Sequence, residues 1–409
     1  MSRPPSPSPE AAPLPPVPAG FTLAGVHCGI KRNPTKPDLT LIVAAAPAIA
    51  AGVYTQNRVC AAPVVYDRQR TPSDAFRVLV VNSGNANACT GERGDKDAAT
   101  MAAAAAEAVA APTDSALVFS TGVIGEYLPM DKIAAGIRDA AALLGDTEAA
   151  LLAAARGMLT TDTVHKVAGR AAKTSAGSVQ ITGLAKGAAM IGPNMATMLA
   201  AIMTDARLQR DDAQRLLAEA VDETFNCISV EGHTSTNDSV VLLASGRAGG
   251  QPLAGDDLAA VAVGLREVCT ELAKAIPADG EGATHLLTID VRGAATREEA
   301  RIVARTVGDS PLVKTAIAGA DPNWGRIVSA VGYANATIES QRVTLAINGH
   351  PLYAQGTPLP FDEAAVSQSI RAARDTHIEI DLGAGDASVR FWTSDLTTEY
   401  VRLNADYRT

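Results

Sequence analysis

The 409-residue sequence has few aromatic residues, which make up 4% of the chain, and no excess of positive charge. Hydrophobic residues account for 47% of the sequence, so the core must be built mainly from alanine, valine, leucine and isoleucine. The formal net charge is −9, and no block of basic residues offsets it. This composition lacks the electrostatic pattern of a nucleic-acid-binding or membrane-surface protein, and we expect small-molecule chemistry.

Cysteine and histidine are also sparse and scattered. The five cysteines are an odd number and include no Cys-x-x-Cys pair, which argues against a disulfide framework and a zinc site. The six histidines show no His-x-x-x-His spacing. We therefore predict reduced thiols, a cytoplasmic location, no metal and no cofactor.

Long hydrophobic runs are missing as well. The two longest, residues 39–54 and 189–203, contain proline and are shorter than the roughly 18 residues of a membrane span. Residues 1–18 are rich in proline, serine and alanine, and we predict a disordered tail there. No apolar segment follows a charged start, so a secretory signal is not expected.

The order of the remaining patterns predicts an α/β fold with layered mixed β-sheets flanked by helices. At this length two or more cores are expected. The predicted strands cover residues 39–43, 51–54, 77–82, 116–119, 239–243, 285–291, 343–347, 377–382 and 388–392. The predicted helices cover residues 95–110, 131–144, 147–159, 210–225, 256–276, 298–308, 311–317 and 363–374.

The most informative segment is residues 186–199, Lys-Gly-Ala-Ala-Met-Ile-Gly-Pro-Asn-Met-Ala-Thr-Met-Leu. It places the hydroxyl of Thr197 between apolar residues. A threonine becomes a nucleophile when cleavage of the preceding bond frees its own α-amine, whose ordinary pKa of about 7.7–8.0 suits a general base. The competing interpretation is a buried helix over residues 195–203, in which the Thr197 hydroxyl bonds to a carbonyl one turn earlier.

This segment resembles the self-cleavage site of the glutamate/ornithine N-acetyltransferase family of arginine biosynthesis, whose members are cut before the threonine of Met-Ala-Thr-Met-Leu. The resemblance extends from about residue 20 to residue 409 and includes the motifs at residues 82–91, 234–238 and 319–326. It implies cleavage between Ala196 and Thr197. An α chain of residues 19–196 follows the tail, and a β chain of residues 197–409 begins with the nucleophile. Both chains are expected to form one globule.

An acyl transfer passes through a tetrahedral oxyanion, which needs fixed hydrogen-bond donors. The turn at residues 120–125, Ser-Thr-Gly-Val-Ile-Gly, can supply the hydroxyl of Thr121 and the N–H of Gly122. Alone, this is an ordinary strand-to-helix turn. The resemblance implies that Thr121 and Gly122 form the oxyanion pair.

The resemblance also implies a set of substrate-binding residues. Read without it, these are a solvated loop lysine, a helix-end threonine, a glutamate in a surface turn and two residues of a frayed end. The implied substrate-binding positions, besides Thr197 itself, are Thr160, Lys186, Glu281, Asn404 and Thr409.

The resemblance implies an enzyme that transfers an acetyl group from N2-acetyl-L-ornithine to L-glutamate through acetyl-Thr197. It also implies an oligomer of cleaved pairs. Three alternatives remain open: a bifunctional enzyme that also uses acetyl-CoA, an N-terminal-nucleophile amidase or aminopeptidase, and a ligand-binding protein in which Thr197 is only a core residue.

Overall fold

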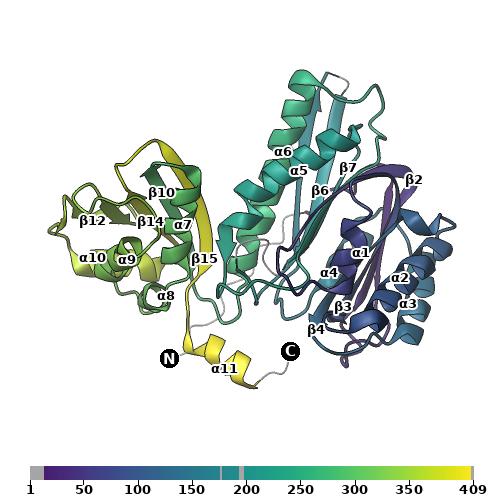
Figure 1. Cartoon of the computed structure of the whole chain (residues 1–409), viewed down its shortest axis with the longest axis horizontal. Coiled ribbons are helices and arrows are strands. Elements are labelled where there is room, and N and C mark those ends of the chain that lie inside the picture. The colour runs from purple at the N-terminus through teal and green to yellow at the C-terminus, as the bar shows by residue number, and fades with distance from the viewer. Residues whose placement is uncertain (1–12, 176, 193–197, 407–409) are drawn as a thin grey trace.

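The computed structural model describes residues 13–175, 177–192 and 198–406, and the description of the fold is confined to them. These residues form two lobes, each built on one β-sheet (Figure 1). The first sheet combines strands from both sides of Thr197, whereas the second contains only strands that follow it.

The first sheet has the strand order β4-β3-β2-β9-β7-β6-β5, with β1 paired to β2. The β3–β4 and β7–β9 pairs are parallel and the other pairs are antiparallel. Its strands are β1 (Phe21–Val26), β2 (Leu39–Tyr54), β3 (Ser73–Asn85), β4 (Ala116–Val123), β5 (Lys166–Thr174), β6 (Gly177–Lys186), β7 (Leu199–Thr204) and β9 (Ser239–Ala244). Its helices are α1 (Ala62–Arg68), α2 (Gly91–Ala108), α3 (Met130–Ala142), α4 (Glu148–Met158), α5 (Arg210–Glu223) and α6 (Gly255–Ala278).

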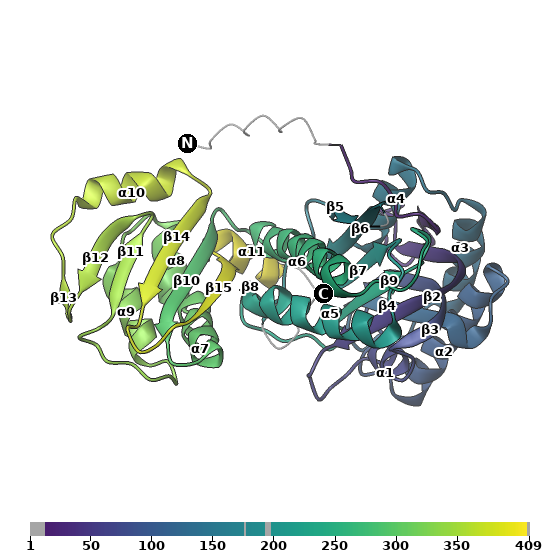
Figure 2. The ribbon, with the colours of Figure 1, turned by 90° about the horizontal axis from the view of Figure 1, so that it is seen from above.

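The second sheet has the order β13-β12-β11-β14-β10-β15-β8. Its strands are β8 (Ile228–Ser229), β10 (Leu286–Ala294), β11 (Thr344–Ile347), β12 (His350–Ala354), β13 (Thr357–Pro358), β14 (Asp375–Asp381) and β15 (Ala387–Ser394). Its helices are α7 (Arg297–Gly308), α8 (Pro311–Ala318), α9 (Trp324–Gly332) and α10 (Glu363–Ala372). Helix α11 (Thr398–Asp406) follows β15 and lies between the lobes in Figure 2.

Strand β3 shows why the first sheet is covered on both faces. Successive strand residues point to opposite faces, and Val78 and Val80 pack with helices α2 and α3. Leu79 and Val81 point the other way and pack with helix α4. A strand that is buried on both faces reads as a continuous apolar run, which is the pattern of residues 78–81.

A single hydrophobic cluster joins the two lobes. It contains residues of α5 and α6 from the first lobe and of β10, α7 and β15 from the second. In α6, Leu272 packs so closely on β6 that a Cβ atom at Gly183 would lie 2.7 Å from the Leu272 Cδ1. The described parts of both predicted chains therefore share one core.

The predicted fold class, layered mixed sheets flanked by helices, is confirmed. The strands predicted at 39–43 and 51–54 are one strand, β2. The hairpin β5–β6, strand β1 and helix α9 were not predicted. The helical interpretation of residues 195–203 is wrong for Leu199–Met203, which belong to strand β7; residues 195–197 lie outside the described part.

The predicted tail of residues 1–18 extends too far. Leu14 and Val17 pack against the core, and the Thr182 hydroxyl donates a hydrogen bond of 2.7 Å to the carbonyl oxygen of Pro16. Apolar contact of Leu14 and Val17 with the core explains why residues 13–18 pack on the lobe although they are rich in proline. Residues 1–12 lie outside the described part.

Three further predictions concern membrane spans, metal sites and cysteines. Among the described residues, no helix is long and apolar enough to cross a membrane, and no group of three or more His, Cys, Asp or Glu side chains is arranged to hold a metal ion. The free thiols are Cys28, Cys60, Cys89, Cys227 and Cys269.

We predict that Leu272→Ala lowers the free energy of unfolding by about 2–5 kcal/mol, because it opens a cavity between α6 and β6. Leu272 is 1% exposed. The matched control is Leu312→Ala, on a side chain that is 60% exposed, which should change stability by less than about 0.5 kcal/mol. Urea denaturation compares the two; similar losses would contradict the packing described for α6.

Candidate active site

The predicted cleavage segment connects two neighbouring strands of the first sheet. Lys186, the last residue of β6, pairs with Leu199, the first residue of β7. Ala196 and Thr197 lie outside the described residues. The residue after Thr197 is fixed, because the Met198 N–H donates to Asp238 Oδ1 at 3.0 Å and the Met198 carbonyl oxygen accepts from the Ser239 N–H at 3.1 Å.

Hydrogen bonds also hold the first half of this segment, at Ile191. The Ile191 N–H donates to Glu231 Oε1 at 2.5 Å. Its carbonyl oxygen accepts from the N–H groups of Val230 and Gly232 at 2.9 and 3.1 Å. Next to it, a Cβ atom at Gly192 would lie 2.2 Å from the carbonyl carbon of Gly232, so this close approach requires glycine.

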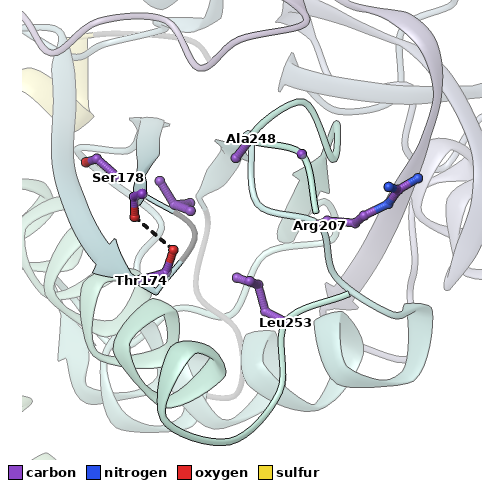
Figure 3. A pocket seen from close by; sticks show the side chains of 8 residues that line it. Thr174, Ser178, Arg207, Ala248 and Leu253 are labelled. Carbon is purple, nitrogen blue, oxygen red and sulfur yellow. Dashed lines mark hydrogen bonds between the residues drawn. The ribbon is translucent and has the colours of Figure 1, made fainter. Parts of the chain in front are cut away.

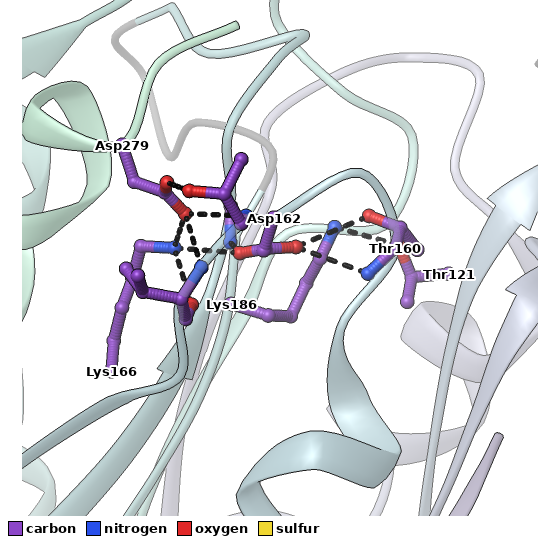
Figure 4. A network of polar contacts seen from close by, with 9 residues as sticks. Thr121, Thr160, Asp162, Lys166, Lys186 and Asp279 are labelled. Atoms are coloured by element: carbon purple, nitrogen blue, oxygen red, sulfur yellow. Dashed lines mark hydrogen bonds and ion pairs between the residues drawn. The ribbon is translucent and has the colours of Figure 1, made fainter. Parts of the chain in front are cut away.

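The predicted oxyanion residues lie at the end of β4. Lys186 Nζ donates a hydrogen bond of 3.0 Å to Thr121 Oγ1, and both side chains are buried (Figure 4). An ammonium group only donates, so the Thr121 oxygen is the acceptor and its own proton remains available. Gly122 has a φ of +135°, and a Cβ atom there would lie 2.2 Å from the carbonyl carbon of Gly84. The site therefore accepts only glycine beside the threonine.

Two asparagines fix the residue before Thr121. Asn237 Nδ2 donates to the carbonyl oxygens of Ser120 and Ala86 at 2.8 and 2.7 Å. The Ser120 hydroxyl donates to Asn82 Oδ1 at 2.5 Å. The motifs at residues 82–91 and 234–238 thus hold the turn in place.

A buried network of charges supports Thr160 and Lys186 (Figure 4). Lys166 Nζ lies between two carboxylates, 2.8 Å from Asp162 Oδ1 and 2.7 Å from Asp279 Oδ2. Asp162 also accepts from the Gly187 N–H at 2.6 Å and from the Thr160 N–H at 3.0 Å. It thereby joins the Thr-Thr-Asp-Thr motif to the first residue after β6.

The network determines the charges of its members. Burial alone would raise the pKa of Asp162, but the ammonium groups of Lys166 and Lys186 and the Gly187 N–H outweigh it and lower the pKa to about 2. Burial lowers the pKa of Lys186, and the negative charge of Asp162 opposes this shift. Asp162 therefore remains ionised and favours the charged form of Lys186 beside Thr121.

Glu281 and Asn404 come together from distant parts of the sequence. Asn404 Nδ2 donates to Glu281 Oε2 at 2.9 Å. The Glu281 N–H donates to the Ala188 carbonyl oxygen at 3.0 Å, so the loop after α6 lies against the segment that follows Lys186. Of the predicted substrate residues, Thr197 and Thr409 lie outside the described part, and the roles of the others remain predictions.

The sequence analysis missed Asp162, Lys166, Asp238 and Asp279. Asp162 lies two residues after Thr160, in Thr160-Thr161-Asp162-Thr163, and Asp279 lies two residues before Glu281, so both could have been proposed as charge partners. Lys166 begins β5, a strand that was not predicted. Asp238 ends the motif at residues 234–238, but its contact with Met198 could not be read from that motif because it joins residues 40 positions apart.

A pocket in the same lobe lies elsewhere. It is lined by Thr174, Ser178, Arg207, Ala248 and Leu253, with Gly177, Val179 and Gly249 (Figure 3). It is at the turn between β5 and β6, whereas Lys166 and Lys186 are at the opposite ends of these strands. It is therefore not part of the site.

Residues 22–409 match the ArgJ family. The chain belongs to this family. A curated ArgJ relative, the arginine biosynthesis bifunctional protein of Rhodopirellula baltica, is 46% identical over 396 residues, covering 96% of each chain. The protein of the same name from Symbiobacterium thermophilum is also 46% identical, over 96% of this chain and 98% of its own.

Among solved ArgJ structures, the crystal structure of the Bacillus halodurans arginine biosynthesis bifunctional protein is 41% identical. The match has a TM-score of 0.50 and covers 51% of this chain and 98% of the solved chain. The predicted family is confirmed. So is the predicted enzyme class, an acyltransferase of arginine biosynthesis.

We predict that Asp162→Asn lowers stability by about 2 kcal/mol at neutral pH. The folded pKa of about 2 lies below the ordinary 3.8, so the ionised carboxylate stabilises the fold fully above pH of about 4. This contribution is lost as the pH falls from about 4 to about 2. Urea denaturation at pH 7 and pH 3 measures the gap between the wild type and the variant; a gap that widens on acidification would contradict the assignment.

Proposed function

We propose that the protein is a glutamate N-acetyltransferase that cleaves itself between Ala196 and Thr197. It transfers an acetyl group from N2-acetyl-L-ornithine to L-glutamate through acetyl-Thr197. The observation that carries this proposal is the buried Lys186–Thr121 hydrogen bond, made by the residue that pairs with Leu199, two positions after Thr197.

The proposed self-cleavage has two steps. The Thr197 hydroxyl attacks the Ala196 carbonyl carbon, the C–N bond breaks, and an ester and a free α-amine result. Water then hydrolyses the ester and releases the Ala196 carboxylate. The matched Bacillus halodurans chain corresponds to 51% of this chain, about the size of one cleavage product, which supports the proposal.

Acetyl transfer consists of two acyl-transfer steps, and both use the hydroxyl of Thr197. The α-amine of Thr197 takes the hydroxyl proton as the oxygen bonds to the acetyl carbonyl carbon, and the Thr121 hydroxyl and Gly122 N–H stabilise the oxyanion. Ornithine leaves with a proton. Glutamate then attacks the acetyl ester and regenerates the hydroxyl. The acetyl donor and the acceptor bind to the site one after the other. Such ping-pong kinetics give parallel lines when reciprocal rate is plotted against reciprocal substrate concentration.

The substrate ammonium group has a matching partner. Asn404 holds one oxygen of the Glu281 carboxylate, and the second oxygen can accept from an ammonium group. Lys186 contributes positive charge that favours the substrate carboxylate. We also infer a reducing cytoplasm as the location, in keeping with the free thiols, and an assembly of cleaved pairs.

We predict that the purified wild-type protein consists of two fragments, residues 1–196 and 197–409. The Thr197→Ala variant should remain one chain of 42.0 kDa. The variant should lose acetyl transfer by at least about 10³-fold, because nucleophile and base are both removed. Denaturing mass spectrometry and an acetylornithine–glutamate assay measure the two effects. Turnover by an uncleaved Thr197→Ala protein would refute the mechanism.

The same assay without glutamate tests the amidase alternative. A transferase should release little acetate from acetylornithine when the acceptor is absent. Acetate release at the rate of the complete reaction would instead identify a hydrolase with water as the acceptor.

A second candidate function is the use of acetyl-CoA as an additional donor, favoured by the word bifunctional in the names of the relatives. We predict that the donor acetylates the same Thr197. In that case acetyl-CoA-dependent and acetylornithine-dependent activities fall together in Thr197→Ala. Loss of only one activity would indicate a second acetylation site.

A further inference from the structure

The carboxyl group of Asp238 accepts a hydrogen bond from Met198, the residue after Thr197. Asp238 immediately precedes β9 and is completely buried. Its Oδ1 accepts the Met198 N–H at 3.0 Å. That N–H belongs to the peptide group that joins Thr197 to Met198, so the carboxyl group acts one bond away from the nucleophilic residue.

The carboxyl group is itself rigidly placed. The Asp238 carbonyl oxygen accepts the Thr55 N–H of the chain after β2 at 2.9 Å. The next residue, Ser239, pairs with Leu199 in the parallel β7–β9 ladder. Asp238 is therefore held in place by β2 and β7, the two neighbours of β9 in the sheet.

The second carboxyl oxygen has no equivalent contact. Oδ2 is buried and has no hydrogen-bond partner among the described residues. Burial raises the pKa of Asp238 well above its ordinary value. The Met198 N–H, the nearby Lys186, the Thr55 hydroxyl and the Ser235 backbone only partly oppose this shift. A buried carboxyl oxygen without a hydrogen-bond partner lowers the stability of the fold.

We propose that Asp238 is a positioning residue for Thr197, which it aligns by holding the Thr197–Met198 peptide group. This inference rests on the proposed function, because alignment matters only if Thr197 attacks a carbonyl carbon. A nucleophile must lie about 3–3.5 Å from its target, and small displacements cost large factors in rate. Asp238 should therefore affect self-cleavage and acetyl transfer but not the affinity for substrate.

The test compares a variant of similar size that lacks the hydrogen-bond acceptor with one that keeps it. Asp238→Leu has a similar size but cannot accept the Met198 N–H, whereas Asp238→Asn keeps an amide oxygen in the same place. We expect Asp238→Leu to slow self-cleavage and to lower kcat at least about 100-fold with KM changed less than about threefold. Asp238→Asn should recover most of both rates. Asp238→Ala replaces the leucine variant if added bulk prevents folding.

Asp67 provides a matched control. It is also completely buried, its Oδ1 accepts the Val118 N–H at 2.9 Å, and its Oδ2 has no partner among the described residues. It lies in α1, and among the described residues its side chain accepts from Val118 on β4 and not from the cleavage segment. Asp67→Leu should lower Tm as Asp238→Leu does, while kcat per folded molecule stays within about threefold of the wild type.

The outcomes separate this inference from the proposed function. If the wild type and Asp67→Leu cleave themselves but transfer no acetyl group, the proposed function fails while the cleavage rates still test Asp238. If the wild type is active and Asp238→Leu equals it, Asp238 has no positioning role. If Asp238→Asn is folded and as slow as Asp238→Leu, the contact with Met198 is not the cause. Either of the last two results overturns the inference.

Discussion

The antiparallel pairing of β6 with β7 is the constraint on which the site depends. The pairing places Lys186 opposite Leu199, the first residue of β7, which lies two positions after Thr197. The hydrogen bond of Lys186 with Thr121 then brings in β4, from the opposite edge of the sheet order. Lys186 and Thr121 lie at strand ends, where ladders of backbone hydrogen bonds hold them in fixed positions.

The buried ions around Lys166 follow from the same geometry. An ammonium group in the interior is unstable unless carboxylates neutralise it, and Asp162 and Asp279 do so from two separate loops. The charges of Asp162 and Lys166 act on Lys186, which hydrogen-bonds Thr121. The network therefore links the folding of the lobe to the electrostatic environment of the turn that contains Thr121.

The sequence predicted most of the fold where periodicity was strong. Helix α5 is an example, with Asp211 and Asp212 in its first turn and buried residues at helical spacing. The hairpin β5–β6 was missed, because alanine and glycine along Lys166–Thr174 give no clear alternation. Thr121, Lys186 and Glu281 were named from motifs, whereas the contacts of Asp238 and Lys166 arise from pairings between distant strands that local patterns do not record.

The strand order has one more consequence, for how the two halves depend on each other. Strands β9 and β7 follow the proposed cleavage site, yet they lie between β2 on one side and β6 on the other, which both precede it. Neither half can leave without opening two ladders in the middle of a sheet. In the proposed self-cleavage, the Ala196–Thr197 bond is therefore a tether that is needed only while the sheet assembles. It makes the pairing of the strands intramolecular, and after the sheet has closed the two ladders hold the proposed products together.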